Sequence, residues 1–101
     1  MYAKGRKQRD FDVDELFIQQ LLELPYEVGV SVVDKLKKNS HTLLSEDGWT
    51  ALKAGVIKGE KPYFFQVEYV NNTGNPPLIL DIEEIDCDTF LDFINAKQIL
   101  K

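Results

Sequence analysis

The first apolar pattern in the chain has the spacing of a helix. Its members, which recur at helical intervals, are Val13, Leu16, Phe17, Leu21 and Leu24. Asp12 is the predicted N-cap, with Glu15 three residues later in a D-x-x-E form of the capping box. Pro25 ends the helix because a proline disfavours helical geometry in the residue before it.

The next segment, 26–38, carries two patterns. Val28, Val30 and Val32 alternate, which favours a strand. Pro25 nevertheless suits the first turn of a helix, and the lysines near position 38 suit the negative end of a helix dipole. We assign the segment to a helix, with the strand as the open alternative.

A third helix is expected between Ser45, as N-cap, and Gly59, as C-terminal glycine. Its apolar face would consist of Trp49, Leu52 and Val56. Gly55 would lie inside this helix at a cost of about 1 kcal/mol relative to alanine, which suggests close approach of a neighbouring element.

Two strands follow, joined by a turn-rich segment at 71–77. In the first strand, 63–70, Phe65, Val67 and Tyr69 alternate with Gln66 and Glu68. In the second, 78–85, Leu78, Leu80 and Ile82 are expected to point inward, with Asp81 and Glu83 outward. The pattern predicts a long antiparallel hairpin with one solvated face.

A last helix is expected from Asp88 or Thr89 through Leu100. Its apolar residues are Phe90, Leu91, Phe93, Ile94, Ile99 and Leu100. They cover a wider arc than one core-facing stripe needs, so the sequence also allows a homodimer through this helix.

Together these elements predict one α+β domain over residues 11–101: three N-terminal helices, the hairpin and a C-terminal helix. Residues 1–10 are expected to form a flexible basic arm. This order resembles that of winged helix-turn-helix domains, which implies a DNA-binding third helix assisted by the arm. The residues it would use are Thr50, Lys53, Lys58, Arg6, Lys7 and Arg9. Glu68, Asp81 and Glu83 oppose this interpretation, because DNA phosphates would repel an acidic wing.

Charge is distributed unevenly along the chain. Residues 1–61 contain ten basic and ten acidic side chains, whereas residues 62–101 contain two lysines and seven acids, which accounts for the net charge of −5. The densest cluster consists of Asp81, Glu83, Glu84, Asp86 and Asp88. Such an acidic cluster can protect a strand edge against aggregation, or it can speed association with a basic partner.

Little in the sequence suggests catalysis. His41 is the only histidine, and Cys87, the only cysteine, is expected to be a buried or half-buried structural thiol because its acidic neighbours suppress the thiolate. The glycines match no phosphate-binding motif, and we expect no metal or cofactor. No apolar run approaches the roughly 18 residues of a membrane helix, and the N-terminus does not resemble a secretory signal, so a cytoplasmic protein is expected.

The preferred interpretation is therefore a small acidic, non-enzymatic binding protein, such as an inhibitor, an immunity protein or an adaptor. It would bind a basic protein partner through the hairpin. The expected contacts are Asp81, Glu83, Glu84 and Asp86, with Tyr63 and Tyr69 as aromatic anchors. The alternative is the DNA-binding regulator implied by the winged-helix resemblance.

Overall fold

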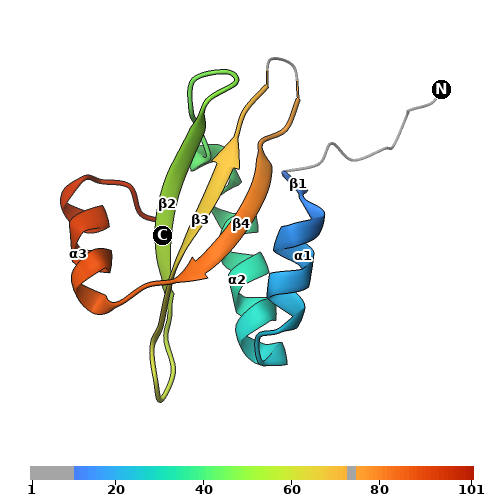
Figure 1. The fold of residues 1–101 in the computed structure, drawn as a ribbon. Coiled ribbons are helices and arrows are strands. Elements are labelled where there is room, and N and C mark those ends of the chain that lie inside the picture. The colour runs from blue at the N-terminus through green and yellow to red at the C-terminus, as the bar shows by residue number, and fades with distance from the viewer. Residues whose placement is uncertain (1–10, 73–74) are drawn as a thin grey trace.

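The protein is a mixed α+β domain built on a four-stranded sheet of order β1-β4-β3-β2 (Figure 1). A computed structural model describes residues 11–72 and 75–101. The arm at 1–10 therefore lies outside the described residues. The elements are β1 (Asp12–Val13), α1 (Glu15–Leu22), α2 (Tyr26–Lys38), η1 (Ser40–Thr42), β2 (Thr50–Ile57), β3 (Tyr63–Val70), β4 (Leu78–Glu84) and α3 (Cys87–Asn95).

The first two predicted helices are confirmed as α1 and α2. The cap of α1 is Asp14 rather than Asp12: its carboxylate accepts a 3.0 Å hydrogen bond from the backbone N–H of Leu16. Asp12 instead lies in β1, which pairs in parallel with Leu78 of β4. Segment 26–38 is a helix and not a strand, so the helical interpretation is correct. Within it, Val32 and Leu36 are fully buried.

The third predicted helix is wrong, because residues 50–57 form β2, the antiparallel neighbour of β3. Trp49 is 68% exposed and Leu52 is 39% exposed, so the apparent helical face does not belong to the core. Gly55 has the expected close neighbour: a Cβ added there would lie 2.8 Å from Cζ of Phe65. Pairing with β3 thus overrides the local helical spacing, and the winged-helix element order is wrong.

The hairpin of β3 and β4 is confirmed, with a β-bulge in its register. Glu68 pairs with Asp81 and Tyr69 pairs with Ile79, which leaves Leu80 as the extra residue. A bulge reverses the alternation of side chains beyond it. The buried residues of β4 are consequently Ile79 and Ile82, and the prediction of an inward Leu78 and Leu80 is wrong.

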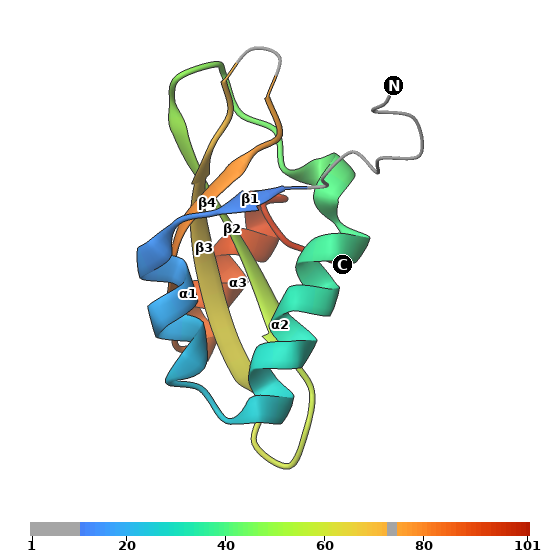
Figure 2. The ribbon, with the colours of Figure 1, turned by 90° about the vertical axis from the view of Figure 1, so that its right-hand side faces the viewer.

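The core lies between one face of the sheet and the pair α1 and α2, whereas α3 lies on the opposite face (Figures 1 and 2). Its buried members are Phe17, Val32, Leu36, Leu43, Phe65, Val67, Tyr69, Ile79, Ile82 and Leu100. Among the described residues, no helix combines the length and apolar character needed to cross a membrane.

The C-terminal helix ends at Asn95, five residues before its predicted end. Lys97 adopts a positive φ of 59°, the left-handed conformation that often terminates helices. Residues 98–100 then run along β2: the N–H of Ala54 donates to the carbonyl of Gln98 (2.9 Å), and the N–H of Leu100 donates to the carbonyl of Ala54 (2.7 Å). This path carries Leu100 into the core.

Candidate partner-binding face

The sheet face opposite α1 and α2 is only partly covered. We call it the open face; because side chains alternate along strands, it carries Thr50, Leu52, Gln66, Glu68, Val70, Leu78, Asp81 and Glu83. The helix α3 covers one end of the sheet here, where the ring of Phe90 packs on that of Phe64 at a centroid distance of 5.0 Å. No helix of the described residues covers the rest of the face (Figure 1).

A hollow of about 520 Å³ lies where the open face meets α3. Its lining residues are Thr50, Ala51, Leu52, Glu68, Asp92, Phe93, Ala96 and Gln98. Leu52 and Phe93 supply apolar surface, and Glu68 and Asp92 supply carboxylates from the strand and the helix. This combination suits the side chain of an arginine or lysine, which has an apolar stem and a cationic end.

Carboxylates continue from the hollow across β3 and β4. Glu68 is directly opposite Asp81, and Glu83 accepts a 3.2 Å hydrogen bond from the side-chain amide of Gln66. Of the described strand residues on this face, none is basic. Like charges in directly opposite positions destabilise a sheet, and a bound cation would relieve that repulsion.

The predicted acidic contacts separate into three places. Asp81 and Glu83 share the open face, whereas Glu84 pairs with Phe65 and so belongs to the helix-covered side of the sheet. Asp86 is the N-cap of α3, where its carboxylate accepts a 2.7 Å hydrogen bond from the backbone N–H of Thr89. Hydrogen bonds from the side chain and then the backbone of Thr89 hold the pKa of Asp86 below its usual value. The structure thus leaves two of the four acids together.

The two predicted aromatic anchors do not lie on the open face. Tyr69 is fully buried and its hydroxyl donates a 2.7 Å hydrogen bond to the carbonyl of Leu44, so the expectation of an exposed anchor there is wrong. Burial raises the pKa of Tyr69. Tyr63 is half-buried on the side of α2 and stacks on Phe65 at 5.9 Å. Burial and then the charge of Glu84 raise the pKa of Tyr63.

The three residues that the DNA-binding alternative assigns to a recognition helix do not lie on a helix. Thr50 and Lys53 belong to β2, and Lys58 directly follows it. The ammonium of Lys53 donates a 3.1 Å hydrogen bond to the side-chain oxygen of Gln98. Arg6, Lys7 and Arg9 lie outside the described residues. Because residues 50–57 form β2, this alternative lacks the recognition helix that it requires there.

Four residues of the candidate site were missed by sequence reasoning: Leu52, Glu68, Asp92 and Phe93. Glu68 had a usable signal, since its alternation with Val67 and Tyr69 already placed it on the solvated side of β3. The sequence pattern places Leu52 on a helix, which hides its position on a strand face. Asp92 and Phe93 join the site only because α3 folds back over the sheet, which no local pattern shows.

The remaining candidate groups for chemistry lie apart from this face. His41 is exposed in η1. Cys87 is the first residue of α3 and is exposed, so the expectation of a buried thiol is wrong. Within residues 11–72 and 75–101, no group of three or more histidine, cysteine or acidic side chains is arranged to hold a metal ion.

Comparison of the chain with protein-family models, with curated proteins and with solved structures gives no match.

Proposed function

We propose that this protein is a non-enzymatic binding module, of the inhibitor, immunity-protein or adaptor type, that recognises a basic segment of a partner protein on the open face. The observation that carries the proposal is the hollow beside α3, whose lining combines the apolar residues Leu52 and Phe93 with the acidic residues Glu68 and Asp92. A purely acidic surface would attract any cation, whereas this hollow can also contact the aliphatic carbons of a lysine or arginine side chain.

The partner's side chain would enter the hollow with its aliphatic carbons against Leu52 and Phe93. Its guanidinium or ammonium group would then form charge-assisted hydrogen bonds with Glu68 and Asp92. Asp81 and Glu83 lie farther along the same face and act mainly on the rate and selectivity of association.

A labelled ten-residue peptide with three arginines and two leucines is a direct probe, with fluorescence anisotropy as the readout. Counterparts that replace arginine with glutamate, or leucine with serine, test the charged and apolar contributions separately. We expect binding of the first peptide that weakens with added salt, because exposed charges are screened at about 8–10 Å near physiological ionic strength. Binding of the serine counterpart should be measurably weaker.

The variant Glu68→Gln, Asp81→Asn, Glu83→Gln should weaken peptide binding at least tenfold. A matched control, Glu23→Gln, Glu27→Gln, Glu60→Gln, removes the same charge from exposed positions away from the open face and should change binding less than twofold. Equal losses in the two variants, or no binding to the intact protein at low salt, would disprove the proposal.

A further inference from the structure

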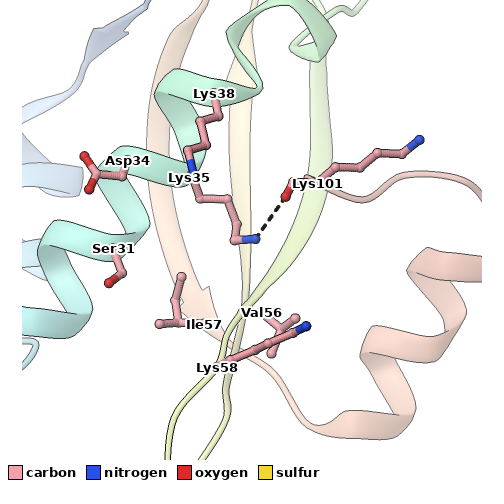
Figure 3. A pocket seen from close by; sticks show the side chains of 8 residues that line it. All are labelled: Ser31, Asp34, Lys35, Lys38, Val56, Ile57, Lys58 and Lys101. Carbon is pink, nitrogen blue, oxygen red and sulfur yellow. Dashed lines mark hydrogen bonds between the residues drawn. The ribbon is translucent and has the colours of Figure 1, made fainter.

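A second hollow, of about 320 Å³, lies on the other side of β2, between α2 and the C-terminal residues (Figure 3). Its lining residues are Ser31, Asp34, Lys35, Lys38, Val56, Ile57, Lys58 and Lys101. Half of them are lysines, although the chain as a whole is acidic. We call this hollow the lysine pocket.

Three segments build the lysine pocket. Lys35 and Lys38 are one turn apart in α2, and Lys58 directly follows β2. The aliphatic part of the Lys35 side chain crosses β2 at Gly55. A Cβ added to Gly55 would lie 3.1 Å from Cδ of Lys35. Its ammonium then donates a 3.2 Å hydrogen bond to the backbone carbonyl of Lys101.

Asn39 fixes these segments in register. Its side-chain amide donates a 2.7 Å hydrogen bond to the carbonyl of Lys35, and its side-chain oxygen accepts a 2.7 Å bond from the backbone N–H of Lys101. Asn39 is only 3% exposed, so water competes little for these bonds. These hydrogen bonds therefore fix the position of the C-terminal residues beside α2.

The lysine pocket concentrates positive charge. Burial, and then the charges of Lys38 and Lys58, lower the pKa of Lys35. The hydrogen bond to the main-chain oxygen of Lys101 orients the Lys35 ammonium. In Figure 3, the carboxylate of Asp34 points away from the Lys35 ammonium, on the other side of α2. An anion between the lysines would offset their mutual repulsion.

We propose that the lysine pocket binds the phosphate group of a small phosphorylated molecule. Lys35, Lys38 and Lys58 would supply cationic donors, Ser31 a hydroxyl donor, and Ile57 an apolar wall for the organic part. The volume lies at the lower end of the range of about 300–1,000 Å³ for small-molecule sites. A nucleic acid fits less well, because its extended phosphate backbone would also meet the repulsion of a chain with net charge −5.

The test is a titration of the ¹⁵N-labelled protein, followed by amide chemical shifts. The four titrants are inorganic phosphate, glycerol 3-phosphate, glycerol and a single-stranded oligonucleotide. We expect saturable shifts with both phosphates, centred on Ser31, Lys35 and residues 56–58, and none with glycerol. Tighter binding of the phosphate ester would identify an organic phosphate as the ligand, and equal binding would identify the phosphate group alone as the recognised feature.

Matched variants separate the lysine pocket from general charge. Lys38→Gln with Lys58→Gln should weaken phosphate binding at least tenfold. Lys37→Gln with Lys61→Gln removes the same charge from exposed lysines outside the pocket lining and should change it less than twofold. Equal effects of both pairs, no saturation with either phosphate, or binding of the oligonucleotide alone would overturn the proposal. Since the open face is on the opposite side of the sheet, this outcome is independent of peptide binding there.

Discussion

The two faces of β3 differ in their side chains: the residues under α1 and α2 are aromatic or aliphatic, whereas the alternate residues include a glutamine and a glutamate. Phe65, Val67 and Tyr69 have no solvent exposure and pack beneath α1 and α2. Gln66 and Glu68, two of the alternate residues, lie on the open face next to acidic residues of β4. One strand therefore stabilises the fold with one face and presents charge with the other, so substitutions should affect stability and binding separately.

The largest expected effect on stability is on the helix-covered face. Phe65→Ala should lower the free energy of unfolding by about 3–5 kcal/mol, because it removes a fully buried ring and leaves a cavity. Urea denaturation followed by circular dichroism measures this loss. Leu52→Ala, on the open face, is the comparison and should cost far less, since Leu52 is already 39% exposed. Similar losses in the two variants would contradict the division between the faces.

A smaller effect is expected where β2 passes Phe65. Gly55→Ala should cost about 1–3 kcal/mol, because the new methyl group would lie 2.8 Å from Cζ of a buried ring that has little room to move. Thermal unfolding compares it with Gly59→Ala. The nearest atom to a Cβ at Gly59 is the Lys61 carbonyl oxygen at 4.0 Å, so this control should unfold near the wild-type temperature. A stable Gly55→Ala variant would show that the core is loosely packed at this point.

The smallest effect has the opposite sign. Glu68→Gln should raise the free energy of unfolding by about 0.2–1 kcal/mol, because it removes the repulsion from Asp81 directly across the strands. The same variant should bind the basic peptide more weakly. Glu60→Gln, at an exposed position after β2, should change neither property measurably. A destabilised Glu68→Gln variant would show that Glu68 serves the fold and not a partner.

Local sequence signals predicted the elements that local energetics can form. Pro25 separates two helices, and the dense turn residues at 71–77 separate two strands, so these boundaries needed no distant contact. Residues 45–59 also carried consistent helix signals, yet residues 50–57 within this segment form a strand. The helix signals there were worth about 1 kcal/mol apiece, whereas pairing with β3 satisfies a full ladder of backbone groups.

The candidate site shows the same limit. Asp81 and Glu83 were placed on a common face by their spacing, which a strand preserves. Tyr69 was expected to act as an exposed anchor, although its alternation with Glu68 already assigned it to the apolar side of β3. The hydrogen bond from its buried hydroxyl to the Leu44 carbonyl depends on the loop before β2. The lysine pocket combines residues of α2, the end of β2 and Lys101, which are far apart in the sequence. It forms because Asn39 holds the C-terminal residues against α2.

By itself the sequence determined the helices α1 and α2, the hairpin, the uneven distribution of charge along the chain, and the alternation that places Glu68 and Asp81 on the face opposite the core. Tertiary structure alone decided that residues 50–57 are a strand, that a bulge directs Ile79 inward, and that α3 and the C-terminal residues complete two separate hollows. The physical reason is the sequence separation of the interacting residues, because helical and strand periodicities are set by neighbours a few residues away. Strand pairing and hollows depend on which distant surfaces bury each other.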